Sequence, residues 1–282
     1  MRAVCVIGLG LIGGSVLRAA ARAGRPVWGA TSSTSDADAA RADGFTVMST
    51  VDEAVAEAAA LDALVVVAVP LPAVAEVLAT VASLAPSCLL TDVVSVKQPV
   101  ADAVGRLVPA ARYAGGHPMA GRSESGWASG SETLFDGAPW VVVADEETDP
   151  AAWREAAVLA LDCGAHVVPT TAGEHDAAVA RVSHLPHLLA AVLAATGADG
   201  GPLALALAAG SFTDGTRVAG TRPELVLAMC EGNRPALLDA VDDALGRLGA
   251  ARGALASTGG LAATVGSGNA ARTALTHVRT GP

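Results

Sequence analysis

A single histidine, His117, lies between glycines and a proline in the segment GGHPMAG at residues 115–121. Because it precedes Pro118, its backbone is restricted to extended geometry, and it cannot lie in the middle of a helix. We therefore expect the imidazole to be presented from a strand end or a loop, where catalytic groups are commonly held. An imidazole accepts a proton near neutral pH, so His117 is a candidate general base.

A glycine-rich loop near the N-terminus predicts the cofactor that would accompany such a base. The run VCVI at residues 4–7 is typical of a strand, and GLGLIGGS at residues 8–15 follows it and begins a helix. In this pattern Gly8 allows the tight turn, Gly10 lets the backbone approach a pyrophosphate, and Gly13 lets the helix pack on the strand. We predict hydride transfer to a nicotinamide dinucleotide. The predicted cofactor-binding residues are Gly8, Gly10, Leu11, Ile12, Gly13, Thr31, Ser32, Val69 and Pro70.

The end of the second predicted strand bears on the choice between NAD and NADP. An acidic residue there usually binds the ribose 2′-hydroxyl of NAD, but residues 31–35 read TSSTS, and no carboxylate appears before Asp36. A row of hydroxyls suits a 2′-phosphate, although the arginine that usually clamps that phosphate is also missing. The sequence therefore allows NAD or NADP, with a slight preference for NADP.

Bulk composition limits the class of protein. The chain has 282 residues, 52% of them apolar, and a formal net charge of −10. This composition supports a sizeable core and argues against a nucleic-acid or anionic-membrane partner, because both require a basic surface. The four cysteines lack CxxC spacing, as in a reduced cytoplasmic protein. We expect no signal peptide and no stretch able to span a bilayer.

Short β-branched runs alternate with alanine-rich helical stretches through the first half of the chain. Several runs are apolar at every residue, as expected for a parallel sheet covered on both faces. The pattern predicts an α/β fold with an N-terminal doubly wound Rossmann-type sheet. Strands are expected at residues 3–7, 26–30, 63–69, 88–94, 112–114, 140–144 and 165–169, and helices at 11–23, 34–43, 51–59, 73–84, 97–106 and 151–163.

The second half of the chain is predicted to be all-helical. Helices are expected at residues 173–196, 202–209, 223–230 and 235–256, and the tail from Ser257 is expected to be partly mobile. We place the boundary near residue 170, which gives a dinucleotide-binding domain at 1–170 and a helical substrate and dimerisation domain at 171–282. Long apolar helices in so small a domain usually need a second subunit to cover them, so a homodimer is expected.

Three further segments are expected to complete a site around His117. TDVVSVK at residues 91–97 ends a predicted strand, at the sheet edge where ligands bind in such folds. SHLPH at residues 183–187 and GSFTDGTR at residues 210–217 lie in the helical half. With VIGLGLIGGS and GGHPMAG, these motifs resemble the prephenate/arogenate dehydrogenase family of tyrosine biosynthesis, in the order and approximate spacing of that family.

The resemblance implies oxidative decarboxylation of prephenate to 4-hydroxyphenylpyruvate in the cytoplasm, without a metal. His117 would accept the proton of the ring hydroxyl as hydride leaves, and Ser95 would contact that hydroxyl and fix the imidazole. Arg217 would bind a substrate carboxylate, and His187 would contribute to anion or ring binding. Lys97 and Asp214 would support the substrate site, although Lys97 also suits a helix start.

Several alternatives stay open from the sequence. Arogenate is the nearest alternative substrate, since Arg122 follows Gly121 where the family often has Thr-Glu or Pro-Glu, and an amino-substituted prephenate is another. A β-hydroxyacid dehydrogenase or imine reductase shares the layout but places a catalytic lysine or another group on the helical domain. A nucleotide-sensing protein would bind cofactor without turnover. We expect His175 to be a helix-start residue and Arg222 to form an ion pair.

Overall fold

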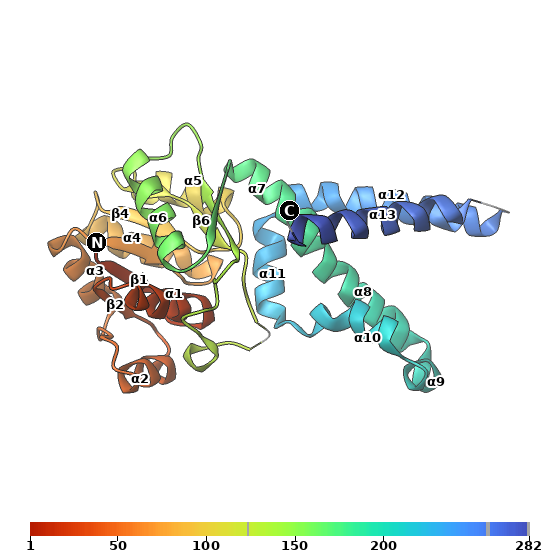
Figure 1. Cartoon of the computed structure of the whole chain (residues 1–282), viewed down its shortest axis with the longest axis horizontal. Helices are drawn as coiled ribbons and strands as arrows, with labels where there is room; N and C mark the ends of the chain where they lie inside the picture. Colours follow the sequence, from red (N-terminus) through yellow and green to blue (C-terminus); the bar gives the residue numbers. More distant parts are fainter. Residues whose placement is uncertain (123, 258–259, 281–282) are drawn as a thin grey trace. The chain divides into compact units, whose positions relative to one another are not determined.

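A five-stranded parallel sheet, ordered β2-β1-β3-β4-β5, forms the centre of the N-terminal half (Figure 1). Its strands are β1 (Val4–Ile7), β2 (Val27–Ala30), β3 (Leu64–Val67), β4 (Leu89–Asp92) and β5 (Arg112–Ala114). The structure is a computed structural model that describes residues 1–122, 124–257 and 260–280. The strand order reverses between β1 and β3, and in such sheets ligands bind at the carboxyl ends of the strands at that point. The predicted doubly wound sheet is confirmed.

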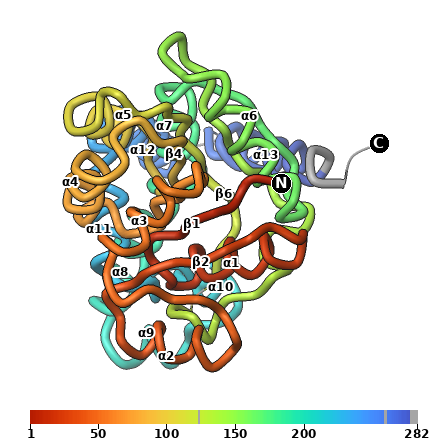
Figure 2. Tube along the Cα trace, turned by 90° about the vertical axis from the view of Figure 1, so that its left-hand side faces the viewer, coloured from red at the N-terminus to blue at the C-terminus, as the bar shows by residue number. Residues whose placement is uncertain are grey.

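Alternate residues of each strand point into two separate apolar cores. Val4, Val6, Leu64 and Val66 pack on one face, whereas their neighbours along the strands pack on the other. Figure 2 shows α3, α4 and α5 on one side of the sheet and α1 and α6 on the other. These helices are α1 (Leu11–Arg22), α3 (Val51–Ala60), α4 (Val74–Leu84), α5 (Gln98–Leu107) and α6 (Pro150–Asp162), with α2 (Thr34–Ala42) after β2. Burial on both faces explains the uninterrupted apolar strands.

A second, three-stranded sheet carries His117. It is ordered β6-β7-β8, from β6 (Gly116–Pro118), β7 (Pro139–Val143) and β8 (His166–Thr170), and β6 runs antiparallel to β7. In this ladder His117 pairs with Val141. The sequence predicted the strands at β7 and β8 but no separate sheet, because a three-residue strand containing proline has too little pattern to detect.

The first long helix of the second half is interrupted where the sequence predicted one helix. α7 (Ala172–Val179) passes into a π-helical turn at Ala180–His184 and then into α8 (Leu185–Asp199). Pro186 has no amide hydrogen to donate to the preceding turn, which explains a change of hydrogen-bond pattern at this point. Wide π turns of this kind are frequent at functional sites.

Shorter helices follow α8. They are α9 (Gly201–Ala206), α10 (Gly210–Thr216), a 3₁₀ turn at Arg217–Gly220 and α11 (Pro223–Gly232). α10 and the 3₁₀ turn pack against α8 (Figure 1). The motif GSFTDGTR is therefore helical.

The chain forms two compact units, Met1–Asn233 and Arg234–Pro282. The second contains α12 (Arg234–Ala256) and α13 (Leu261–Thr280), which pack against each other. The tail from Ser257, expected to be partly mobile, is helical at Leu261–Thr280, and its mobility stays a prediction. The compact units thus divide at Asn233 rather than near residue 170, because α7 and α11 pack on the sheet-bearing part; the boundary near residue 170 stays a prediction about folding domains.

The helical stretch Ala172–Asp199 is long and apolar enough to cross a membrane by length and composition, contrary to expectation. Its first part, however, carries His175, Asp176 and His184, whose side chains are buried and hydrogen-bonded inside the protein. Polar groups held in this way are typical of a packed protein helix and costly in a bilayer.

A buried ion pair lies beneath β6. Lys97, the only lysine of the chain, is 1% exposed, and its ammonium contacts the Asp92 carboxylate and the Gly116 carbonyl. The hydroxyl of Tyr113 donates to the other carboxylate oxygen of Asp92 at 2.6 Å. Burial, followed by the charge of Asp92, raises the pKa of Tyr113 well above its usual value, which keeps the hydroxyl protonated as a donor.

We expect Lys97→Met to lower the free energy of unfolding by about 3–5 kcal/mol, because it leaves a buried carboxylate without its cation. Denaturant unfolding would measure the change. The matched control is Arg41→Met, whose ion pair with Asp38 is exposed; it should cost less than about 1 kcal/mol. Equal effects of the two substitutions would contradict a stabilising role for the buried pair.

Candidate active site

The glycine loop between β1 and α1 is shaped to receive a phosphate group. Gly8 has φ +100°, and a Cβ at Gly13 would lie 1.9 Å from the Gly8 carbonyl oxygen, so neither position admits a side chain. A Cβ at Gly10 would meet nothing within 4 Å, which leaves the backbone open on the ligand side. No side chain caps the N-terminus of α1, whose free amides and helix dipole favour an anion. The loop therefore fits a dinucleotide diphosphate.

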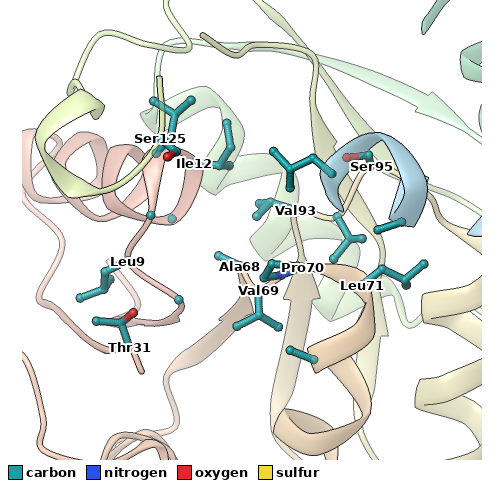
Figure 3. Close-up of a pocket in the computed structure, with 18 of the residues that line it drawn as sticks. Leu9, Ile12, Thr31, Ala68, Val69, Pro70, Leu71, Val93, Ser95 and Ser125 are labelled. Atoms are coloured by element: carbon teal, nitrogen blue, oxygen red, sulfur yellow. The ribbon is translucent and has the colours of Figure 1, made fainter. Parts of the chain in front are cut away.

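A cleft of about 700 Å³ opens over this loop (Figure 3). All nine residues predicted to bind the cofactor line it, and binding itself stays a prediction. Figure 3 shows Thr31 beside Leu9 on one side of the view, Ser95 on the other, and Ala68, Val69, Pro70 and Leu71 between them. An elongated cleft with a glycine loop and hydroxyl-bearing residues suits an extended dinucleotide.

Charged and polar residues also line the cleft. The loop after β6 contributes Arg122, whose guanidinium donates to the Ser129 carbonyl at 3.3 Å. Asp36, at the start of α2, lines the cleft as well, and one of its carboxylate oxygens accepts from the Trp127 amide at 2.8 Å. The lining of the cleft therefore includes both a carboxylate and a guanidinium.

The opposite wall comes from the helical segments. His187 lines the cleft and donates from Nδ1 to the Ser183 carbonyl at 2.8 Å. Arg222 also lines it, and its guanidinium donates to the Ser125 hydroxyl at 3.4 Å. The sequence predicted an ion pair for Arg222, and none is seen within the described residues. The sequence feature that could have pointed to Arg222 is its position directly before Pro223, the first residue of α11.

His117 is the first member of a hydrogen-bonded chain of three side chains. Its Nδ1 lies 2.8 Å from Nε2 of His175, and Nδ1 of His175 lies 2.7 Å from Oδ1 of Asp176. A carboxylate can only accept, so Nδ1 of a neutral His175 is the donor and its Nε2 is an acceptor. Nδ1 of His117 then donates, and Nε2 of His117 carries the lone pair. That Nε2 has no hydrogen-bond partner among the described residues.

Asp176 is fixed from several directions. Its carboxylate accepts the backbone amides of Lys97 and Gln98 at 2.8 and 2.9 Å, at the N-terminus of α5. Burial by itself raises the pKa of Asp176, but the hydrogen bonds from His175, Gln98 and Lys97 outweigh it and hold the pKa below its usual value. Asn233 donates to the Asp176 carbonyl at 2.7 Å. Asp176 is therefore a rigid, ionised acceptor.

Some predicted site residues do not line the cleft. Lys97 does not line the cleft, and its ammonium is buried against Asp92; its substrate-binding role stays a prediction. Asp214 and Arg217 are exposed and absent from the lining, and His117, half-buried in β6, is absent from it as well. Ser95 and His187 do line it. Within the described residues, no group of three His, Cys, Asp or Glu side chains could hold a metal ion.

Comparison with known proteins agrees with this architecture. The family model for the prephenate dehydrogenase nucleotide-binding domain matches residues 15–169, and the model for the prephenate dehydrogenase dimerization domain matches residues 171–259. The chain belongs to the prephenate dehydrogenase family. Prephenate dehydrogenase of Bacillus subtilis is 35% identical over 159 residues, which are 55% of this chain and 43% of that protein. This chain therefore matches less than half the length of that relative.

Other relatives in this family are named for different substrates. Cyclohexadienyl dehydrogenase of Zymomonas mobilis is 32% identical over 190 residues, 64% of each chain. A Corynebacterium glutamicum structure, described as a candidate prephenate dehydrogenase, has a TM-score of 0.93 at 45% identity and covers 99% of this chain and 89% of that chain. Synechocystis arogenate dehydrogenase has a TM-score of 0.80 at 28% identity, covering 98% and 100%. The prephenate dehydrogenase fold thus extends over the whole chain.

We expect Gly10→Ala and Gly13→Ala to separate ligand contact from packing. Gly10→Ala leaves the melting temperature unchanged, because its Cβ enters open space, but weakens dinucleotide binding at least tenfold by blocking the diphosphate. Gly13→Ala lowers the melting temperature, because its Cβ overlaps the Gly8 carbonyl. Calorimetry and dinucleotide titration measure both effects. Unchanged binding in Gly10→Ala would show that the diphosphate lies elsewhere.

The pH dependence of turnover should reflect a neutral His117. Burial, then the neighbouring His175, Lys97 and His184, lowers the pKa of His117 well below 6.5. A lowered pKa means that the unprotonated base persists as the pH falls through 6.5. We therefore expect the fall in kcat/KM on the acidic side of the pH profile to be centred below pH 6.5. A fall centred at or above pH 6.5 would contradict His117 as the titrating base.

Proposed function

We propose that the chain catalyses the NAD(P)-dependent oxidative decarboxylation of prephenate to 4-hydroxyphenylpyruvate. The observation that carries the proposal is the His117 imidazole, held through Nδ1 by His175 with Nε2 unpartnered among the described residues, in a protein whose cleft is lined by a dinucleotide-type glycine loop. Removing hydride from a carbinol carbon requires a base for the hydroxyl proton. The family membership supports the same reaction.

Different residues would bind the cofactor, accept the proton and orient the substrate hydroxyl in this reaction. The bound dinucleotide supplies the hydride acceptor, held by the loop at Gly8–Gly13 and the walls at Thr31 and Val69. Nε2 of His117 takes the proton from the ring C4 hydroxyl, and Ser95 orients that hydroxyl from the cleft wall. Loss of carbon dioxide then aromatises the ring, which drives the reaction forward without a metal.

Substrate anions require local cations in this acidic chain. Arg217 is proposed to bind a substrate carboxylate, in keeping with the family motif, and Arg222 supplies a second guanidinium that lines the cleft. Planar guanidinium groups suit carboxylates. Asp214 is proposed to support this region from α10.

Arogenate is a second candidate substrate. Synechocystis arogenate dehydrogenase shares the fold over nearly the whole of both chains, and the Zymomonas relative is named for cyclohexadienyl substrates in general. Nε2 of a neutral His187 is an acceptor at the cleft, which suits the ammonium of an amino-acid side chain. Turnover with arogenate but not prephenate would select this alternative.

The cofactor proposal is NAD(P). The preference for NADP rested on the lack of a carboxylate before Asp36, yet Asp36 itself lines the cleft and favours the ribose 2′-hydroxyl of NAD. Arg122 on the same cleft favours a 2′-phosphate instead. These opposing charges remove the basis for preferring NADP.

A homodimer in the cytoplasm is part of the proposal. α8 and α9 leave several large apolar side chains exposed, and the matching family model is named for dimerization. Those side chains include Leu189, Val192, Leu193, Leu203 and Leu205. A second copy covering these leucines would remove apolar surface from water.

The competing dehydrogenase class has little support here. A catalytic lysine on the helical part is absent from the sequence, because the only lysine is Lys97, which is buried before α5. A 3-hydroxyisobutyrate dehydrogenase of Mycobacterium tuberculosis has a TM-score of only 0.53 at 21% identity, a likeness of fold alone.

We expect His117→Asn to reduce turnover by about two to four orders of magnitude, the usual value of a positioned base, with dinucleotide affinity nearly unchanged. Reduced-nicotinamide absorbance is measured for prephenate and arogenate, each with NAD and NADP. The matched control is His166→Asn, since His166 is exposed on β8; it should keep wild-type turnover. Wild-type turnover in His117→Asn would overturn the proposed base.

A further inference from the structure

We propose that His175 and Asp176 are positioning residues that select the reactive tautomer of His117. The proposal deepens the proposed function and rests on it for the effect on rate, whereas the tautomer itself can be measured without any turnover. The sequence predicted only a helix-start role for His175.

The geometry indicates that the hydrogen bonds joining His117, His175 and Asp176 have a defined direction and do not arise from packing alone. His175 and Asp176 are 3% and 5% exposed, and both come from the start of α7, which packs beside α5. The rings of His117 and His175 meet edge to face, with an interplanar angle of 73° and centroids 5.0 Å apart. Side-chain contacts of 2.8 and 2.7 Å join the three residues in series. Buried polar groups with such short contacts orient one another strongly.

The direction of these hydrogen bonds is set at Asp176, the residue of the series farthest from His117. The two amides at the start of α5 donate to Asp176, so its carboxylate is held in place as an acceptor. His175 must then present a donor to Asp176 and, as a neutral ring, an acceptor to His117. In the opposite tautomer, Nε2 of His117 would carry the hydrogen and could not take a proton from substrate. A wrong tautomer of a catalytic histidine costs about 10⁴ in turnover in a Ser-His-Asp triad.

The groups around His117 and His175 favour a neutral imidazole at His117. Lys97, directly before α5, and His184, in the π turn, both lower the pKa of His117, and Asn233 donates toward Nδ1 of His184 at 3.1 Å. Burial lowers the pKa of His184 to about 4, so this histidine is neutral near pH 7. The positive charge of Lys97 lowers the pKa of His117 and so opposes protonation of its imidazole.

Two substitutions at position 175 test the role. His175→Phe keeps a ring but removes both nitrogens, and we expect kcat to fall by about tenfold to a hundredfold with KM and dinucleotide affinity within twofold of wild type. In His175→Gln, the amide nitrogen can donate to Asp176 and the amide oxygen can accept from Nδ1 of His117. We therefore expect His175→Gln to recover most of kcat. Equal losses in both variants, or a loss confined to KM, would overturn the proposal.

Nitrogen-15 NMR of histidine-labelled protein reads the tautomer directly. His117 is assigned from the signals missing in His117→Asn. We expect a protonated Nδ1 and an unprotonated Nε2 in the wild type, and a mixture of tautomers in His175→Phe. A protonated Nε2 in the wild type would overturn the proposal even if His175→Phe fails to fold. If the NMR result holds but neither prephenate nor arogenate is oxidised, the proposed function fails and the tautomer assignment stands.

Glu174→Ala is the matched control for α7. Glu174 is exposed and completes a capping box with Thr171 at the start of this helix. Its loss should lower the melting temperature, typically by the equivalent of about 1 kcal/mol, with kcat and the His117 signals unchanged. A fall in kcat as large as that of His175→Phe would show that helix stability, and not the tautomer, controls turnover, and would overturn the proposal.

Discussion

The Asp176 carboxylate is the contact on which the arrangement of the site depends. It accepts two backbone amides from the start of α5 and one imidazole hydrogen from His175. The same group therefore ties α7 to the nucleotide-binding sheet and sets the direction of the hydrogen bonds that reach His117. A carboxylate is suited to both tasks because it accepts several hydrogen bonds and donates none.

Beneath His117, a second buried network supports β6. Asp92 contacts Lys97 and Tyr113, and Lys97 also contacts the Gly116 carbonyl, one residue before His117. Buried ion pairs often contribute little net stability, but breaking one is costly. This network therefore serves mainly to fix the backbone that carries His117. A three-residue strand with proline has too few ladder hydrogen bonds to hold that position alone.

Much of the fold and part of the site could be predicted from sequence. The apolar strands, the glycine loop and the cleft-lining positions follow from local sequence pattern. The glycine loop is an example, because the backbone at Gly8 and Gly13 leaves no room for a side chain. The roles of Lys97 and Arg222 could not be predicted, since each depends on a partner far along the chain. The burial of Lys97 against Asp92 is a contact that the sequence did not predict.

The sequence alone determined the class of fold and the family, and it singled out His117 as the candidate base, because each depends on residue types at short, fixed spacing. The tertiary structure decided which nitrogen of His117 has no partner among the described residues, which arginines line the cleft and where the compact units divide. These depend on hydrogen bonds such as that between His117 and His175, 58 residues apart in the chain. Spacing along a sequence carries no information about the direction of such a bond.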